Sequence, residues 1–333
     1  MLRRSAGEAC LRFGIIGPGE HASEHLLPAL AQLDGVRLTA VAARSHDRAR
    51  AAADRWGATR YSGEWRDLLD PDAVDALIVA ATPELHAEVM EVALRLGVSV
   101  FVEKPPAPTT SSLERLIAHE RTAPAGTVAF VGFNFPYGAS YVTLRDALTP
   151  HGEIRSFDVR LVSSKPLEAE HGESLERTLL LGLGSHAIDM AVREMGAPAS
   201  VDVSRTRIDE RRLIMRIWLG YPDGRLASVQ IGNHSNRLEY RCELTTADAV
   251  TGVLDQHNVL TLAEAGKSPR RASIAAKETV RYEWPSRRGG YARTGYLPEL
   301  DSFRRSVAEG LPSSSSLTAS LTSYKIIDRV QEL

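Results

Sequence analysis

The stretch LRFGIIGPGEHA, from Leu11 to Ala22, joins a short apolar segment to a helical one through a glycine-rich turn. In a G-x-G-x-x-A pattern the first glycine permits a tight turn, the second lets a pyrophosphate approach the backbone, and the alanine keeps helix and strand close. The start of the helix supplies unpaired N–H groups to an anion. We therefore predict a dinucleotide site lined by Gly17, Pro18, Gly19, Glu20 and His21; a glycine-rich turn without a ligand is the alternative.

The first part of the chain alternates short apolar runs with helical segments. Runs of strand length occupy residues 11–16, 36–43, 74–80, 98–102 and 128–131. Helical spacing covers residues 20–33, 45–57, 84–96 and 110–121. Fully apolar strands separated by helices indicate a parallel sheet that is buried on both faces. We expect an α/β nucleotide-binding domain over residues 1–131.

The pattern changes after about residue 133. Strand candidates follow one another with few helices between them, at 154–161, 201–208, 213–221, 225–231 and 238–245. Pro222-Asp223-Gly224 is a turn signal that predicts a hairpin. Helices are expected near 185–195, 297–309 and 318–332. Residues 132–333 are therefore predicted to form an α+β domain with a large, mostly antiparallel sheet, with the last helices as candidates for packing back onto the first domain.

Composition excludes several classes of protein. The 333 residues carry 40 Lys+Arg and 42 Asp+Glu, and this balance argues against nucleic acid as the main partner. No apolar run reaches the ~18–20 residues that span a bilayer, and residues 1–10 lack the apolar core of a secretory signal. Two cysteines and ten histidines without ligand spacing predict no disulfide framework and no metal site. We expect a cytoplasmic protein without a membrane segment.

The end of the second strand bears on the choice of cofactor. An NAD site usually places an acid there to bind the ribose hydroxyls. This chain reads Val41-Ala42-Ala43-Arg44-Ser45, with no acid. A guanidinium can hold a 2′-phosphate through two hydrogen bonds. Arg44 and Ser45 therefore favour NADP(H) over NAD(H), unless Arg44 is only a solvated residue at a helix start.

Further motifs resemble the glucose–fructose oxidoreductase / inositol dehydrogenase / MocA (Gfo/Idh/MocA) family. They are Ala81–His86, Glu103-Lys104-Pro105, Gly132-Phe133-Asn134 and Gly184–Asp189. The resemblance implies an N-terminal Rossmann domain, a C-terminal domain with an open antiparallel sheet, and nicotinamide-dependent redox chemistry on sugars or cyclitols. It also implies homodimers or homotetramers that pack through the open sheets.

The same resemblance assigns roles to individual residues. The lysine that matches Lys104 contacts the reacting oxygen in the family, so Lys104 is the first catalytic candidate; a surface lysine at a strand end is the alternative. His186 matches the histidine of the second domain and is the second candidate. The cofactor side is expected to include Thr82, Pro83, His86, Glu103, Lys104 and Pro105.

One family position is different in this chain. The family has an aspartate four residues before the histidine, and Gly182 stands there. Three interpretations stay open: Lys104 and His186 suffice for proton transfer, Asp189 orients His186, or the protein has lost turnover.

Two loops are candidates for substrate recognition, residues 164–177 and 284–296. Residues 267–305 hold ten Lys+Arg against four Asp+Glu, which suits the diphosphate of a nucleotide-linked sugar or, alternatively, a solvated loop. Phe135 follows Asn134 where relatives often have arginine, which indicates a more apolar contact. The predicted substrate-binding residues are Asn134, Tyr137, Arg177, Asp189, Tyr291 and Tyr296.

The predicted function is an NADP(H)-dependent oxidoreductase that reduces a keto group of a sugar, a nucleotide-linked deoxysugar or a cyclitol. Hydride would come from the nicotinamide C4, and Lys104 or His186 would supply the proton. A biosynthetic imine reductase is one alternative. A dinucleotide-binding regulator with a degenerate site is the other, because Gly182 replaces the acid.

Overall fold

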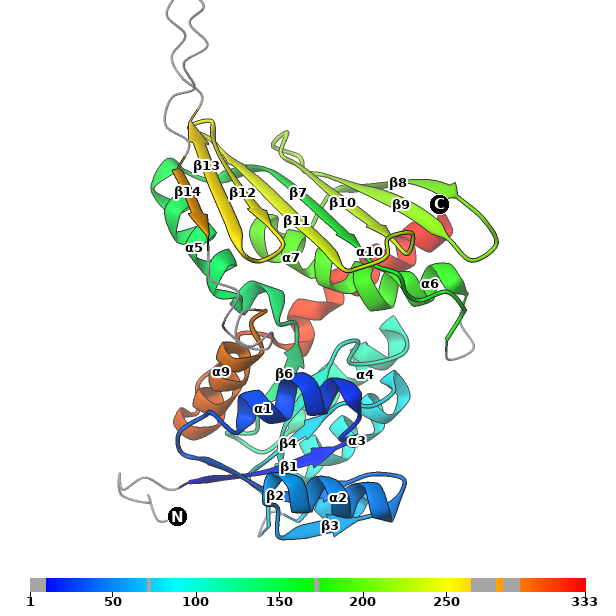
Figure 1. The fold of residues 1–333 in the computed structure, drawn as a ribbon, viewed down its shortest axis with the longest axis vertical. Helices are drawn as coiled ribbons and strands as arrows, with labels where there is room; N and C mark the ends of the chain where they lie inside the picture. The colour runs from blue at the N-terminus through cyan, green and yellow to red at the C-terminus, as the bar shows by residue number, and fades with distance from the viewer. Residues whose placement is uncertain (1–9, 71–72, 171–173, 265–279, 284–293) are drawn as a thin grey trace, which may run out of the picture. The chain divides into compact units, whose positions relative to one another are not determined.

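Two separate sheets organise the chain (Figure 1). The computed structural model describes residues 10–70, 73–170, 174–264, 280–283 and 294–333. The chain divides into two units, Met1–Asn134 with Gly290–Leu321 and Phe135–Gly289 with Thr322–Leu333. Sequence patterns placed the division after residue 131; in the structure it follows residue 134, and a segment near the C-terminus joins the first unit.

The first unit contains a six-stranded parallel sheet in the order β3-β2-β1-β4-β5-β6. Its strands are β1 Leu11–Ile16, β2 Val36–Ala42, β3 Arg60–Ser62, β4 Ala76–Val79, β5 Ser99–Glu103 and β6 Ala129–Gly132. Every residue of β4, β5 and β6 is buried. Continuous apolar strands are typical of a sheet covered on both faces, so the predicted parallel sheet is confirmed.

Capping residues set the ends of two helices as the sequence indicated. Helix α2 (His46–Trp56) begins after Ser45 and ends at Gly57, which has a left-handed backbone. Helix α3 (Pro83–Leu96) begins after Thr82 and ends at Gly97 in the same conformation. The remaining helical segments of this unit are α1 Leu27–Leu30, α4 Thr110–Thr122, α9 Tyr296–Glu309 and the 3-10 turn Trp65–Leu68.

The helix predicted over 20–33 differs from the one observed. A π-helical segment, Ala22–Leu26, precedes α1, and the N–H of Leu27 donates to the carbonyl of Ala22. The helix ends early because the N–H of Gln32 donates to the carbonyl of Ala29, which tightens the last turn. This π segment directly follows the glycine-rich turn. π-helical turns often occur at functional sites.

Helix α9 belongs to the core of the first unit although it is far away in the sequence. The ring of Phe303 packs against Phe13, Phe101 and Phe130, with centroids 5.7, 5.8 and 5.7 Å away. Ser315 also donates its hydroxyl to the carbonyl of Val131 (2.7 Å), on β6. These contacts explain why 290–321 groups with the N-terminal residues. The long helix α10 (Leu317–Glu332) contains the division between the units.

The second unit contains an eight-stranded sheet in the order β14-β13-β12-β11-β7-β10-β9-β8. Among the described strands of this second sheet, β7 and β10 form the only parallel pair. The strands are β7 Ile154–Val162, β8 Ser200–Arg207, β9 Leu213–Gly220, β10 Leu226–Gly232, β11 Glu239–Thr246, β12 Val250–Asp255, β13 Val259–Glu264 and β14 Val280–Glu283. The predicted α+β class and the β9–β10 hairpin are confirmed, whereas β12, β13 and β14 were not predicted.

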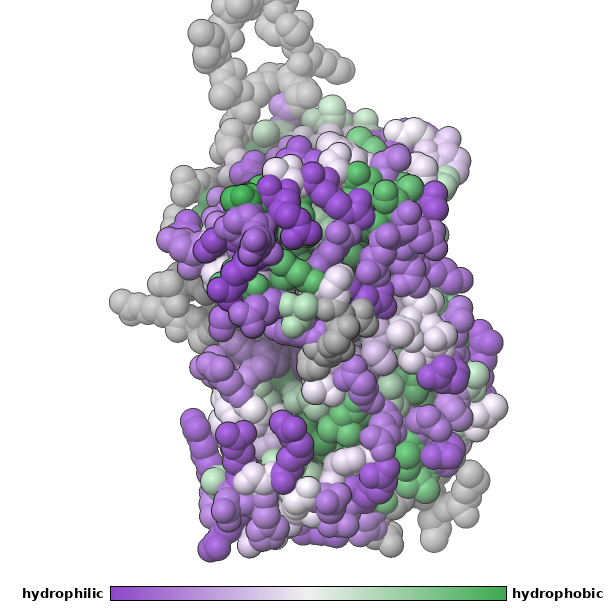
Figure 2. All heavy atoms as spheres, turned by 90° about the vertical axis from the view of Figure 1, so that its right-hand side faces the viewer, coloured by the Kyte–Doolittle hydropathy of each residue, from purple (hydrophilic) through white to green (hydrophobic). Residues whose placement is uncertain are grey.

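Helices cover one face of this sheet, and alternate residues of the strands are buried on that side, as in β9 and β11 (Figure 1). The helical segments of the unit are α5 Ala139–Leu148, α6 Leu175–Leu179, the π segment Leu180–Gly184, α7 Ser185–Met195 and the 3-10 turns Phe135–Tyr137 and Thr149–His151. No helix in the described residues has the length and apolar character to cross a bilayer. Hydrophilic residues predominate on the side of the molecule drawn in Figure 2.

The turn between β11 and β12 offers a stability test. Ala249 is exposed and has a φ of 58°, a conformation that costs a residue with a Cβ about 1 kcal/mol. Ala249→Gly should therefore stabilise the protein by up to about 1 kcal/mol, measured by denaturant unfolding. Gly224→Ala is a control for the reverse change. Gly224 has a φ of 80° in the β9–β10 turn, so this substitution should destabilise the protein. A lower unfolding midpoint for Ala249→Gly would contradict the assignment.

Candidate cofactor and substrate sites

The glycine-rich turn lies where the ends of β1, β2 and β4 meet. Gly17 has a φ of 83°, and a Cβ on it would lie 2.3 Å from the carbonyl oxygen of Ala80, so only glycine fits. Its N–H donates to the carbonyl of Ala42 (3.0 Å). A Cβ on Gly19 would meet no atom within 4 Å. Packing therefore does not require glycine at 19, and the open backbone there fits the approach of a phosphate.

The end of β2 presents two candidate groups for the second phosphate of NADP. The side chain of Ser45 accepts from the N–H of Arg48 (3.4 Å), so it serves as the N-cap of α2. Arg44 is exposed beside it. Both side chains are exposed, and the hydroxyl of Ser45 can still donate a hydrogen bond to a ligand while it caps the helix.

His86 holds the loop that carries Lys104. Its Nε2 accepts from the N–H of Ala81, and its Nδ1 donates to the carbonyl of Pro105, both at 2.9 Å. The ring is 1% exposed, and burial lowers the pKa of His86, which agrees with a neutral ring in this bonding pattern. The Lys104–Pro105 peptide is cis. His86 therefore fixes the ends of β4 and β5 together through both ring nitrogens.

Thr82 and Pro83 have structural roles at the start of α3. The hydroxyl of Thr82 accepts from the N–H of Leu85 (3.4 Å), and Pro83 is the first residue of the helix. Thr82 and Pro83 follow β4, and the glycine-rich turn follows β1. Because β4 and β1 are paired in parallel, the two segments lie side by side.

An acid, two histidines and a tyrosine gather next to Lys104. The Nε2 of His21 lies 3.1 Å from Oε1 of Glu103. The ring of His25 stacks on Tyr296 (4.9 Å, 8°), and His21 meets both rings edge-on. Residues from the turn, from β5 and from α9 thus form one cluster at the carboxyl end of the sheet, which is where ligands bind in open α/β sheets.

The charges in this cluster favour an ionised Glu103. Burial raises the pKa of Glu103, but the hydrogen bond and charge of His21, with Lys104 and His86, outweigh it and bring the pKa below its usual value. Burial and the neighbouring His21 lower the pKa of His25. Burial, and then Glu103, raises the pKa of Tyr296 well above its usual value. His25 was not predicted, although it follows His21 at the i+4 helical spacing.

In the second unit, the acid expected to assist His186 is bound elsewhere. His186 lies in the first turn of α7 and is 8% exposed. The carboxylate of Asp189 accepts from Nε of Arg193 (2.6 Å) on the same helix. Burial raises the pKa of Asp189, and Arg193 opposes the shift. A Cβ on Gly182 would meet no atom within 4 Å, so the missing family acid leaves open space.

The other predicted substrate residues have varied surroundings. Arg177 donates to Asp328 (3.2 Å) and Gln331, so it joins α6 to α10 within the second unit. Asn134 is 1% exposed and donates to the carbonyl of Thr294 (2.7 Å) in the first unit. Tyr137 is half-buried in the turn after β6. Tyr291 lies outside the described residues.

The predicted catalytic pair is divided between the units, with Lys104 in the first and His186 in the second. Within the described part of the chain, no group of three or more His, Cys, Asp or Glu side chains is placed to hold a metal ion.

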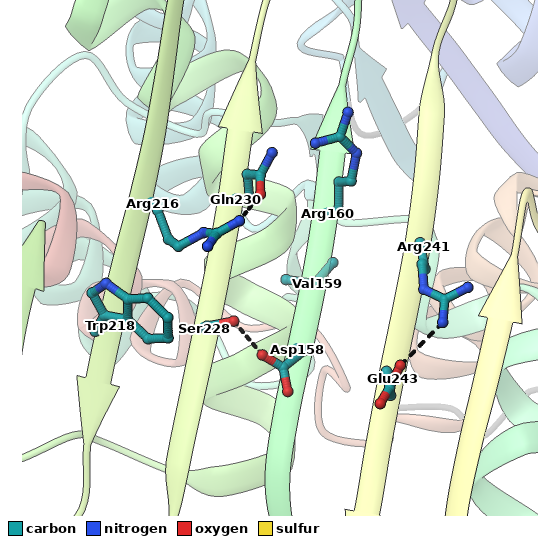
Figure 3. Close-up of a pocket in the computed structure, with 9 residues that line it drawn as sticks. All are labelled: Asp158, Val159, Arg160, Arg216, Trp218, Ser228, Gln230, Arg241 and Glu243. Atoms are coloured by element: carbon teal, nitrogen blue, oxygen red, sulfur yellow. Dashed lines mark hydrogen bonds and ion pairs between the residues drawn. The ribbon is translucent and has the colours of Figure 1, made fainter. Parts of the chain in front are cut away.

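A hollow of about 240 Å³ lies on the face of the eight-stranded sheet opposite its buried residues (Figure 3). Its lining comes from β7, β9, β10 and β11: Asp158, Val159, Arg160, Arg216, Trp218, Ser228, Gln230, Arg241 and Glu243. Arg241 pairs with Glu243 (3.1 Å), and Arg160 pairs with Glu239 at its edge (3.0 Å). No residue predicted from sequence for cofactor or substrate lines it.

Comparisons with known proteins agree with this arrangement. The family model "Oxidoreductase family, NAD-binding Rossmann fold" (GFO_IDH_MocA) matches residues 11–133. The dTDP-3,4-didehydro-2,6-dideoxy-α-D-glucose 3-reductase of Streptomyces antibioticus is 31% identical over 238 residues, which are 69% of this chain and 72% of that protein.

Solved structures share the whole fold. A dehydrogenase from Chromobacterium violaceum has a TM-score of 0.90 at 27% identity, covering 97% of this chain and 95% of the other. A 3-ketoreductase from Actinomadura kijaniata in complex with NADP and TDP-benzene has a TM-score of 0.75 at 23% identity, covering 97% of both chains. The glycine-rich turn, the Glu103-Lys104-Pro105 loop and these likenesses together show that the chain belongs to the Gfo/Idh/MocA family of oxidoreductases.

Proposed function

We propose that this protein is an NADP(H)-dependent reductase of a keto group on a sugar, with nucleotide-linked deoxysugars as the favoured substrate class. The observation that carries the proposal is the position of Lys104. It follows β5 at the carboxyl end of the parallel sheet, beside an open glycine-rich turn and an ionised Glu103. The 31% identity to a dTDP-deoxysugar 3-reductase supports the substrate class.

The residues present fit a dinucleotide. The backbone of Gly17 and Gly19 and the helix start at Glu20 would hold the pyrophosphate, because a Cβ at 19 has free space around it. Thr82 and Pro83 supply backbone on the adjacent strand end. When bound, the reduced nicotinamide supplies the hydride that reaches the carbonyl carbon.

Lys104 donates the proton to the carbonyl oxygen in this proposal. The neighbouring Glu103 is ionised, because His21 and Lys104 hold its pKa below the usual value despite its burial. His86 bonds to the N–H of Ala81 and the carbonyl of Pro105, so the backbone next to Lys104 has a defined position. His186, in the first turn of α7, is the second proton donor in this proposal.

Arg44 supports NADP(H) as the cofactor. It is exposed at the end of β2, where no acid is available to bind ribose hydroxyls. Its planar guanidinium can form two hydrogen bonds to a phosphate. The relative from Actinomadura kijaniata was crystallised with NADP.

Gly182 favours a second candidate, a dinucleotide-binding regulator without turnover. Asp189 is bound to Arg193 and a Cβ at 182 has empty surroundings, so neither position supplies an acid to His186. An imine substrate is the enzymatic alternative, because a protonated imine needs less acid catalysis.

Self-association through the sheet is part of the proposal. Charged and polar side chains from four strands line its uncovered face, with Trp218 among them (Figure 3). Two copies could bury this face against each other as a homodimer. The free thiols of Cys10 and Cys242 fit a reducing compartment such as the cytoplasm.

Lys104→Ala tests the catalytic assignment. Loss of a positioned proton donor should lower kcat by about 100-fold or more, while the Kd for NADPH stays within about threefold. The assay follows NADPH absorbance with a panel of keto sugars that includes dTDP-3,4-didehydro-2,6-dideoxy-α-D-glucose. Full activity of the variant would exclude Lys104 as the donor. NADPH binding without turnover of any compound by the wild-type protein would favour the regulator.

Arg44→Gln tests the cofactor assignment. Without the guanidinium, the ratio of kcat/KM for NADPH over NADH should fall at least about tenfold, because each tenfold loss corresponds to about 1.4 kcal/mol. Arg48→Gln is the matched control, since Arg48 is also exposed and lies in the same helix start. A wild-type preference for NADH, or equal ratios for both variants, would contradict the proposal.

A further inference from the structure

His186 belongs to a cluster of four aromatic rings that come from separate segments of the second unit. Phe135 stacks on the imidazole of His186, with centroids 4.6 Å apart and planes 13° apart. Phe135 meets Tyr240 (5.2 Å, 67°) and His257 (4.8 Å, 75°) edge-on. His257 stacks on Tyr240 (4.0 Å, 8°). All four residues are buried, with exposed fractions between 1% and 8%.

The position of His257 is unusual for its residue type. It lies in the turn between β12 and β13, where the N–H of Asn258 donates to the carbonyl of Asp255 (3.1 Å). The two central residues, Gln256 and His257, have φ values of 50° and 58°. Turns of this kind prefer Asn-Gly because both positions need a positive φ. A buried side chain on a residue with this sparsely populated backbone conformation suggests a role for the ring.

Tyr240 connects this cluster to the helix of His186. Its hydroxyl donates to Sδ of Met190 (3.9 Å), one turn after His186 on α7. The carbonyl of Tyr240 also accepts from the N–H of Gln256 (2.8 Å), which fixes the turn that presents His257. The helix, the strand β11 and the turn are therefore held in one arrangement around Phe135.

The cluster lies where this chain lacks the usual acid. Gly182 provides no side chain, and the carboxylate of Asp189 is bound to Arg193. A parallel stack fixes the plane of an imidazole through its face and does not use the ring nitrogens, which lie at the edge. Stacking can thus orient a histidine that hydrogen-bonds to a substrate.

We propose that Phe135 and His257 are positioning residues for His186, and that this aromatic stack helps to orient the imidazole in a chain that has glycine at position 182. The inference rests on the proposed function, in which His186 is the second proton donor. Phe135 acts directly on His186. His257 acts through Phe135 and Tyr240.

Leucine and aromatic substitutions separate orientation from packing. Phe135→Leu and His257→Leu keep apolar bulk but remove the ring plane, whereas Phe135→Tyr and His257→Phe retain it. Phe157→Leu is the matched control, because Phe157 is fully buried in β7 of the same unit and lies outside the four-ring cluster. Thermal melts of every variant show how far each change alters folding.

The first measurement uses no substrate. In protein labelled with ¹³C-histidine, the ring signal of His186 is assigned by its loss in His186→Asn. The facing ring of Phe135 should shift this signal upfield. Phe135→Leu should abolish the shift, His257→Leu should reduce it, and Phe157→Leu should leave it unchanged. An unchanged signal in Phe135→Leu would overturn the inference.

The second measurement is steady-state kinetics with NADPH and dTDP-3,4-didehydro-2,6-dideoxy-α-D-glucose. Misplacing a reacting group by about 1 Å can cost about 100-fold. We expect kcat to fall about 10- to 100-fold in the two leucine variants, with the KM for NADPH unchanged and activity recovered in Phe135→Tyr and His257→Phe. Equal losses in Phe157→Leu, or no recovery in the aromatic variants, would assign the rings to packing alone and overturn the inference.

Different results would contradict the proposed function and the positioning role of Phe135 and His257. If His186→Asn keeps full activity, the role of His186 in the proposed function is wrong, and the positioning role fails with it. If His186→Asn loses activity while both leucine variants keep it, only the positioning role is wrong. If the wild-type protein turns over no compound of the panel, the proposed function fails, and the ring signal of His186 still decides whether Phe135 holds it.

Discussion

The first unit depends on a steric constraint at Gly17. A Cβ there would lie 2.3 Å from the carbonyl oxygen of Ala80, and the N–H of Gly17 is bonded to Ala42. The turn therefore touches the ends of both neighbouring strands, β2 and β4. This close approach leaves the backbone of Gly19 open, and it brings His21 to Glu103 at the end of β5. One position without a side chain thus aligns the phosphate site with the loop of Lys104.

The sequence was most informative where local chemistry decides structure. Ser45 and Gly57, at the two ends of α2, identified a helix correctly because caps satisfy the free backbone groups of the ends. Buried runs predicted the strands β1, β2, β4, β5 and β6 within about two residues. The π segment at Ala22–Leu26 was missed because side-chain spacing hardly distinguishes it from an α-helix.

Two hairpins of the second unit, β11–β12 and β12–β13, were missed for a specific reason. A tight β-hairpin turn is usually recognised in a sequence by Asn-Gly or a similar pair, because its central residues need a positive φ. The β12–β13 turn instead uses Gln256 and His257, and the β11–β12 turn uses Ala249 at a φ of 58°. These residues carry no turn signal, so the strands on either side could not be paired from sequence. The unusual turn also presents His257 to the ring cluster.

Several residues that were predicted for the cofactor or substrate site also have structural contacts that the sequence analysis did not identify. His86 and Ser45 were assigned to the cofactor, and the structure shows their polar atoms bonded to the backbone of the first unit. Asp189 could have been paired with Arg193 from the i, i+4 spacing alone. A buried carboxylate needs a cation nearby, and Arg193 supplies it to Asp189. In the proposed arrangement, the ring of Phe135 on the face of His186 contributes orientation without adding a further charge to the buried site.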